Sequence, residues 1–317
     1  MKLKLIALAA MLAAGSANAA IDTGLLSGNG ELLLNLKWKD TNTTTNGNTS
    51  ASAAFDLGIT MDFAVSNFNT AGYTQSWDLS SYGSALSTFL GTTDLVMANA
   101  EMNVFALDGT GTNPGDTRIV STTNGINSTG TALSLLAASI PANANFNNIF
   151  GNTTVTNFLV AVNNSASHDS AANGASNADA TSGNAWFDNG TGMDKFANLS
   201  GFDSTNKFDG SYAAGTGVLS GQAKALPFYM VVASSNTPTD KATMTPFGAD
   251  LYGDGLVEFD NNGADAGGMS EYGLWTLQGN TLTYSVAAAV PEAETYAMML
   301  AGLGLVGFMV RRRRNAI

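Results

Sequence analysis

The sequence predicts an all-β protein, a β-sandwich of jelly-roll type with a few short helices. Short apolar or alternating segments recur along the chain, and turns rich in Gly, Asn and Ser separate them. Successive β-α-β units, which would favour a parallel sheet, are not seen. No internal repeat of fixed period occurs, which disfavours a propeller, a solenoid or a β-helix.

The first elements of the body are a predicted hairpin and a half-buried strand. Residues 25–38 contain two apolar stretches joined by a Gly-Asn-Gly turn, which favours a hairpin. The Thr and Asn run at 40–50 has no periodicity and predicts a loop. Residues 54–65 then carry apolar side chains at every second position, opposite a polar face. This period of two is typical of a strand with one face in the core.

Short helices and strands follow each other irregularly in the middle of the chain. Helical spacing predicts helices at 77–90 and 131–140. Strand-like patterns occupy 93–107 and 155–162. Residues 163–184 are Ser, Ala, Asn and Asp with almost nothing apolar. Such a segment cannot bury enough surface to offset its ordering entropy, so the sequence predicts a mobile loop there.

The last part of the body returns to strands. The predicted elements are a helical turn within 186–199 and strands at 215–223, 226–234, 241–248, 273–277 and 281–287. A Gln-Gly-Asn turn at 278–280 joins the final two strands, so we expect a hairpin that runs directly into the C-terminal segment.

The N-terminus has the three parts of a secretory signal peptide, predicted over residues 1–19. Two lysines precede an apolar core at 5–14, and small residues follow it. Ala17 and Ala19 supply the small side chains that signal peptidase requires, so cleavage is expected between Ala19 and Ala20. The body that follows is therefore expected outside the inner membrane, as one region covering residues 20–289.

The C-terminal segment, residues 290–317, combines a short Pro-Glu element, an apolar run and a basic cluster. The element and the cluster consist of Val290, Pro291, Glu292, Arg311, Arg312, Arg313 and Arg314. Residues 296–310 carry no charge, and as a helix they would extend about 22 Å against a hydrocarbon core of about 30 Å. The run predicts a transmembrane helix of marginal length. Arginines stay on the cytoplasmic side, so we expect the tail inside and the body outside.

This arrangement resembles the PEP-CTERM sorting signal of Gram-negative bacteria that make extracellular polysaccharide. In that family a membrane-embedded exosortase recognises and processes the signal. The resemblance implies that Pro291 and Glu292 are recognition residues, that 296–310 is a transient anchor and that 311–314 stops transfer. Ala293 departs from the family pattern, since it stands where a second proline would be. An ordinary C-terminal membrane anchor without processing is the alternative.

The chain is strongly acidic and contains no cysteine. It has 13 Lys and Arg residues against 25 Asp and Glu residues. Setting aside the two signal-peptide lysines and the four tail arginines leaves 7 basic residues, and hence a net charge near −18. Such a surface repels nucleic acid, so we expect no nucleic-acid partner. The absence of cysteine excludes thiol nucleophiles, thiolate metal sites and iron–sulfur clusters.

Two patterns that could suggest an enzyme are weak. His168, the single histidine, lies beside Asp169 in the predicted loop, where a Ser-His-Asp triad would lack rigid support. The Gly-x-Gly-x-x-Gly pattern at 302–307 lies inside the apolar run, so it does not indicate a dinucleotide site. Small residues in such a helix fit close contact with another helix better.

An acidic loop at 250–265 is the strongest candidate for a ligand site. Its carboxylates come from Asp250, Asp254, Glu258 and Asp260. Neighbouring Gly and Asn residues would let the loop wrap a cation, which makes calcium a candidate ligand. The spacing does not match the twelve-residue helix–loop–helix site, and acidic turns without an ion are the other interpretation. No other cofactor is predicted.

Together these features predict an exported, non-enzymatic cell-surface or extracellular-matrix protein that passes through an inner-membrane intermediate. The resemblance links it to exopolysaccharide and biofilm. Expected partners are signal peptidase, an exosortase-like membrane enzyme and extracellular polysaccharide. The alternatives are a carbohydrate-binding or calcium-dependent adhesive module and a secreted polysaccharide hydrolase, for which the sequence selects no carboxylate pair. We expect most tryptophans in the core instead of on a sugar-binding face; they are Trp38, Trp77, Trp186 and Trp275.

Overall fold

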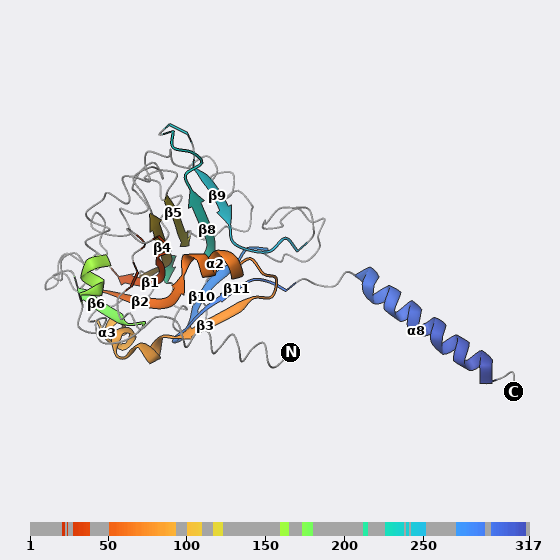
Figure 1. Cartoon of the computed structure of the whole chain (residues 1–317). Coiled ribbons are helices and arrows are strands. Elements are labelled where there is room, and N and C mark those ends of the chain that lie inside the picture. The colour runs from red at the N-terminus through yellow and green to blue at the C-terminus, as the bar shows by residue number, and fades with distance from the viewer. Residues whose placement is uncertain are drawn as a thin grey trace.

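A computed structural model gives the architecture of the protein (Figure 1). It describes residues 21–22, 24, 28–38, 51–92, 100–109, 117–122, 159–164, 173–179, 212–214, 226–237, 239–240, 242–251, 271–288 and 293–314. Within these ranges the body is mostly β-sheet with a few short helices, which confirms the predicted fold class at that level.

The strands are short, and every pairing between them is antiparallel. Their bounds are β1 (Glu31–Trp38), β2 (Ala51–Thr60), β3 (Thr74–Asp78), β4 (Ala100–Gly109), β5 (Thr117–Thr122), β6 (Ala175–Asp179), β7 (Tyr212–Ala214), β8 (Leu226–Val232), β9 (Thr243–Pro246), β10 (Leu274–Gln278) and β11 (Thr281–Ser285). The helices are α2 (Met61–Asn67), the 3-10 helix η1 (Leu79–Tyr82), α3 (Ala85–Leu90) and α8 (Ala293–Arg314).

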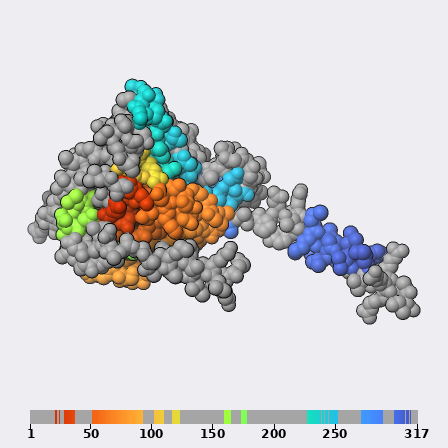
Figure 2. All heavy atoms as spheres, in the orientation of Figure 1, coloured from red at the N-terminus to blue at the C-terminus, as the bar shows by residue number. Residues whose placement is uncertain are grey.

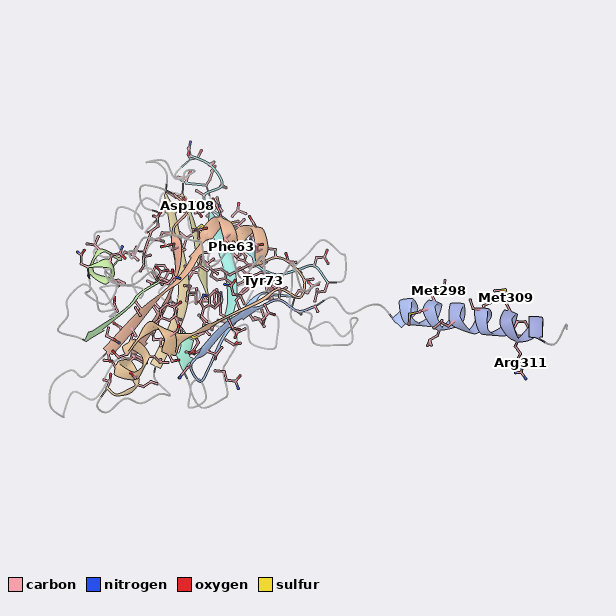
Figure 3. All side chains as sticks on the ribbon, turned by 60° about the horizontal axis from the view of Figure 1, so that its bottom comes forward. Phe63, Tyr73, Asp108, Met298, Met309 and Arg311 are labelled. Carbon is pink, nitrogen blue, oxygen red and sulfur yellow. The ribbon has the colours of Figure 1, made fainter. Side chains whose placement is uncertain are left out.

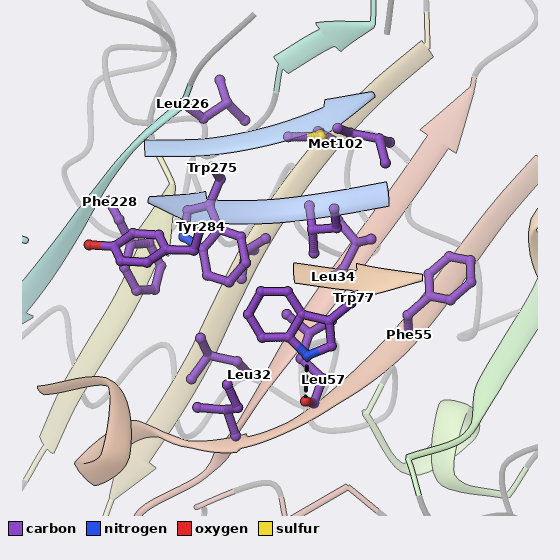
Figure 4. Packing of buried hydrophobic residues seen from close by; sticks show 14 of the residues in the cluster. Leu32, Leu34, Phe55, Leu57, Trp77, Met102, Leu226, Phe228, Trp275 and Tyr284 are labelled. Carbon is purple, nitrogen blue, oxygen red and sulfur yellow. Dashed lines mark hydrogen bonds between the residues drawn. The ribbon is translucent and has the colours of Figure 1, made fainter. Parts of the chain in front are cut away.

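The strands form two layers with apolar residues between them. The order along the sheet is β3-β11-β10-β8-β5-β4-β1-β2-β6, with β7 added to β4 and β9 to β8. A short pairing of β10 with β8, at Leu274–Pro227 and Trp275–Leu226, joins the two parts. Figure 4 shows β3, β10 and β11 lying over the longer strands with the core side chains between the layers. This arrangement is sandwich-like, and the jelly-roll connection stays a prediction.

Aromatic side chains fill the centre of this core. Tyr284 stacks on Phe68 with ring centroids 4.1 Å apart, and Trp275 lies edge-on to Phe68 at 5.9 Å. Phe228 meets Trp275 at 5.6 Å. The hydroxyl of Tyr284 donates a 2.8 Å hydrogen bond to the carbonyl of Phe68, so its polar end is satisfied inside the core.

The layer that does not contain β3, β10 and β11 is the longer layer, and its central strands β1, β2 and β4 are buried on both faces. This corrects the prediction of a half-buried strand at 54–65. Alternate residues of β1 and β2, such as Leu34 and Phe55, face the aromatic core. On the other face Asn35, Asp56 and Asn103 are only 1–2% exposed. Period-two alternation therefore distinguishes two faces of this strand, but it does not make the polar face a solvent face.

The predicted strand at 54–65 also ends earlier than expected. β2 stops at Thr60, and α2 begins at Met61. The hydroxyl of Thr60 accepts a 3.4 Å hydrogen bond from the N–H of Phe63, and Asp62 lies in the first turn. Both features are typical of a helix start, so the strand prediction is wrong for 61–65.

Other boundaries differ because tertiary pairing overrides local pattern. The helix expected at 77–90 begins within β3, continues as η1 and becomes α-helical only at Ala85–Leu90. Residues 159–162, expected as a strand, are helical. The loop predicted at 163–184 is wrong for Ala175–Asp179, which is the strand β6 paired with β2. Backbone pairing needs no large apolar side chains, so composition did not reveal this strand.

The final hairpin is confirmed. β10 pairs with β11 from Leu274–Ser285 to Gln278–Thr281, and Gly279 in the turn has a φ of +55°. The strands expected at 226–234 and 241–248 correspond to β8 and β9. The signal peptide at 1–19, the helices expected at 131–140 and 186–199 and the strand at 215–223 lie outside the described residues.

Candidate functional site

The C-terminal segment contains a helix whose apolar surface is uncovered. In α8 the side chains of Met298, Leu300 and Phe308 are 75%, 65% and 67% exposed. No atom of the body comes within 4 Å of the place where a side chain would begin at Gly302 or Gly304. Exposed apolar residues lie on all sides of the helix, since successive positions differ by about 100°. Figures 1 and 3 show α8 apart from the body.

Helix α8 confirms that the apolar run is helical, but the transmembrane prediction for 296–310 is not confirmed. Among the residues that the structure describes, no helix is long and apolar enough to cross a membrane. Only the middle of α8 is uncharged, because Glu294 stands near its start and the arginines occupy its last turn. Cations at a helix C-terminus and a carboxylate at its N-terminus favour the helix itself through its dipole.

The sorting residues predicted from sequence are only partly covered by the structure. Arg311 is exposed in the last turn of α8, and the backbone helix continues through Arg314. The element Val290, Pro291 and Glu292 lies outside the described residues, as do Ala17, Ala19 and Ala20 of the signal peptide. Their roles stay predictions.

The tail leaves the body beside a turn that holds the end of the last strand. After β11 the N–H of Val286 donates to the carbonyl of Tyr73, and the N–H of Gly72 donates to the carbonyl of Ala287, both at 2.9 Å. Val286 is 3% exposed and belongs to the core cluster. Tyr73 is labelled in Figure 3 on the side of the body that faces α8. The chain is therefore fixed to the body up to Ala287.

The outer face of β3, β11 and β10 is rich in hydroxyl groups. Antiparallel register places Ser76, Thr283 and Thr276 side by side across the three strands. The Ser76 and Thr283 hydroxyl oxygens are 2.9 Å apart, within hydrogen-bond distance. The adjacent rows of this hydroxyl face are Thr74 with Ser285 and Leu274, and Asp78 with Thr281 and Gln278. None of these residues is buried, whereas Trp77, Leu282 and Trp275 between them point into the core.

Sequence reasoning missed the hydroxyl face, although a signal for it exists. Thr281, Thr283 and Ser285 alternate with Leu282 and Tyr284 along the strand. In β3, Thr74, Ser76 and Asp78 alternate with Gln75 and Trp77. What the sequence does not contain is the pairing that sets the two rows side by side, because β3 and β11 are about 200 positions apart.

A buried carboxylate lies on the second face of the longer layer. Asp56 accepts a 2.8 Å hydrogen bond from the N–H of Gly58 through Oδ1, while its Oδ2 has no hydrogen-bond partner. Burial and, to a smaller extent, the charge of Glu31 raise the pKa of Asp56 to about 7, although the hydrogen bond from the Gly58 N–H opposes this rise. The pKa of Glu31 is also raised, mainly by burial. Asp56 is 1% exposed, whereas Glu31 is only partly buried and accepts a 2.7 Å hydrogen bond from the N–H of Asp22.

A second charged group ties α2 to the sheet. Arg118 in β5 donates to Asp108, its cross-strand partner in β4, and to Asp62 in the first turn of α2. Asp108 is 7% exposed at its side chain, whereas Asp62 is 58% exposed. The arrangement neutralises the buried carboxylate and orients α2.

The predicted calcium site is not tested by the described residues. Asp250 is exposed, and Asp254, Glu258 and Asp260 lie outside those residues. No group of three or more acidic or histidine side chains in the described part of the chain could hold a metal ion. His168 also lies outside it. Trp77 and Trp275, 8% and 0% exposed, confirm the core placement expected of them.

Comparison with known proteins identifies the tail and leaves the body unmatched. The family model of the PEP-CTERM protein-sorting motif matches residues 289–314. No curated protein and no solved structure matches the chain. The match covers the Pro-Glu element, the apolar run and the four arginines together. The motif implies export, a membrane-anchored intermediate and processing by an exosortase. The chain therefore carries a PEP-CTERM protein-sorting motif, as expected of an exosortase substrate.

Proposed function

We propose that this protein is a non-enzymatic cell-surface or extracellular-matrix component, delivered through a membrane-anchored intermediate on which an exosortase acts. The sorting motif at 289–314 carries the proposal. The uncovered apolar surface of α8 supports it, since a helix whose apolar side chains are exposed on all sides requires an apolar or protein environment. The motif directly follows the last strand, so the sorted cargo is the β-sheet body.

Mapping of the mature C-terminus by mass spectrometry tests this function. In cells that have the exosortase, we expect the peptide containing Arg311 to be missing from the mature protein. In cells without the enzyme it should persist. The variants Pro291→Ala and Glu292→Gln should also retain it, whereas Glu294→Gln, outside the Pro-Glu element, should be processed normally. Persistence of the peptide in wild-type cells would leave a plain membrane anchor.

The hydroxyl face supports extracellular polysaccharide as the partner of the body. Its side chains are short, mostly uncharged and held at strand spacing, about 4.8 Å between neighbouring strands. Ser and Thr hydroxyls both donate and accept hydrogen bonds, as sugar hydroxyls do. The acidic charge of the chain disfavours an anionic polymer, so we propose a neutral polysaccharide.

Retention of the purified mature protein in gels containing a neutral polysaccharide measures this contact. The triple change Ser76→Ala, Thr276→Ala and Thr283→Ala should abolish the retention, and Thr239→Ala, far from this face, should not. Turnover of the saccharide would instead favour the hydrolase. Retention that requires calcium and disappears when Asp250, Asp254 and Asp260 are neutralised would favour the calcium-dependent module.

A further inference from the structure

The point at which the sorting motif leaves the body is fixed by the fold. The backbone bonds from Gly72 to Ala287 and from Val286 to Tyr73 extend the pairing of β3 with β11 by two residues. Gly72 has a φ of +74°, and a side chain there would lie 3.6 Å from Cβ of Ala288. The turn at Gly72 therefore lies beside the chain as far as Ala288, the last residue before the motif begins at 289.

The distance from this fixed point to the Pro-Glu element is short. Pro291 is the fourth residue after Ala287, and a fully extended chain spans at most about 14 Å over four residue steps. One α-helix with its side chains is about 10 Å wide. A binding site that surrounds the chain at Pro291 with even one layer of helix would therefore occupy most of the space between Pro291 and the body. An enzyme that encloses Pro291 therefore comes close to the body around the exit.

Several small, uncharged side chains of the described residues lie at this exit. Asn69, Thr70, Ala71, Gly72 and Ala288 are all exposed. We call these five residues the exit rim. The carboxamide of Asn69 accepts a 3.0 Å hydrogen bond from the N–H of Gly248, which attaches the rim to the segment after β9. Figure 2 shows the surface of residues 51–92, in orange, extending to the side of the body from which the tail leaves.

We propose that the exit rim is the docking surface for the membrane-embedded sorting enzyme, which therefore recognises the motif together with the folded body. This inference rests on the proposed function. Three observations carry it: the backbone bonds at Gly72 and Val286, the short tether to Pro291, and the continuity of the rim with the motif. Small side chains permit the close approach that the tether imposes.

A bulky residue in the rim tests the proposal in cells that have the exosortase. Ala71→Trp and, separately, Thr70→Trp should slow conversion of the membrane-anchored form to the processed form. We expect about a tenfold effect, which corresponds to roughly 1.4 kcal/mol in the docking step. Thr239→Trp, exposed at the connection of β8 and β9, places the same bulk away from the rim and should leave the rate unchanged.

A flexible insertion distinguishes two causes of slow processing, namely hindered docking of the enzyme and damage to the fold. A linker of about 12 Gly and Ser residues placed after Ala288 has a root-mean-square span of about 19 Å, so the enzyme no longer meets the rim. We expect this insertion to restore rapid processing to the Ala71→Trp variant. Wild-type rates for both rim variants, or slow processing that the linker does not relieve, would overturn the docking surface. Failure of the wild-type chain to be processed would overturn the proposed function as well, and the two failures are thus distinguishable.

Discussion

The indole Nε1 of Trp77 donates a 2.9 Å hydrogen bond to the backbone carbonyl of Leu57, which joins β3 in one layer to β2 in the other (Figure 4). Trp77 also stacks on Trp275 with ring centroids 5.3 Å apart. The bond is buried, so water cannot replace the lost donor. It is a polar link between the two layers within a mostly apolar core.

The change Trp77→Phe should therefore lower the free energy of unfolding by more than the loss of packing volume alone explains, because the hydrogen bond to Leu57 is lost as well. Trp275→Phe is a matched control, because the Nε1 of Trp275 is buried without a hydrogen-bond partner. We expect the Trp77 variant to lose about 1–2 kcal/mol more free energy of unfolding than the Trp275 variant. Urea denaturation of both proteins measures the difference. Equal losses would mean that the hydrogen bond contributes nothing beyond packing.

Stability should fall between pH 4 and pH 7 because of Asp56. Burial raises the pKa of this carboxyl from its usual value of 3.8 to about 7, so the folded state favours the protonated acid. The stabilisation is fully present below pH 4 and is lost as the pH rises through 7. The full effect is on the order of 4 kcal/mol. Asp56→Asn should flatten this part of the pH profile of unfolding, and an unchanged slope would contradict the assignment to Asp56.

The two glycines at Gly58 and Gly279 should respond differently to alanine. Both have positive φ, at +62° and +55°. A Cβ at Gly58 would lie 2.5 Å from Oδ1 of Asn173, whereas one at Gly279 would meet nothing within 4 Å. Gly279→Ala should cost about 1–2 kcal/mol for backbone strain alone. Gly58→Ala should lower the thermal midpoint further, and equal midpoints would show that Asn173 moves aside freely.

Removal of Arg118 should be much more costly than removal of its exposed partner. In Arg118→Met the buried carboxylate of Asp108 loses its cation, which we expect to cost about 3 kcal/mol. Asp62→Asn breaks only the exposed arm of the pair and should cost about 0.5 kcal/mol. Chemical denaturation of the two variants tests this order. A larger loss for Asp62→Asn would place the important contact at α2 instead of in the sheet.

The sequence predicted those parts of the protein that local pattern determines. The hairpin of β10 and β11 follows from alternation and a glycine turn, and the sorting motif follows from three adjacent segments. The start of α2 was missed because apolar alternation continues through Met61 and Phe63, although the Thr60 cap marks the change. β6 was missed because its strand character comes from pairing with β2.

The candidate sites divide in the same way. The tail could be assigned from residues 290–314 alone. The exit rim could not, because it depends on the contact of Gly72 with Ala287, two residues 215 positions apart. Nor could the burial of Asp56, because a polar face at period two is equally compatible with solvent and with a second covered side.

The pairing of β3 with β11 also sets an order of events during export. Thr74–Asp78 emerges early from the translocation machinery, but its partner Thr281–Ser285 follows about 200 residues later. Closing so long a loop is slow in comparison with forming local structure. The smaller layer can be completed only when the final strand has crossed, immediately before the sorting motif arrives. The motif thus reaches the membrane just after the last strand of the domain becomes available. Completion of the fold and arrival of the sorting motif therefore both depend on export of the segment from β11 to residue 289.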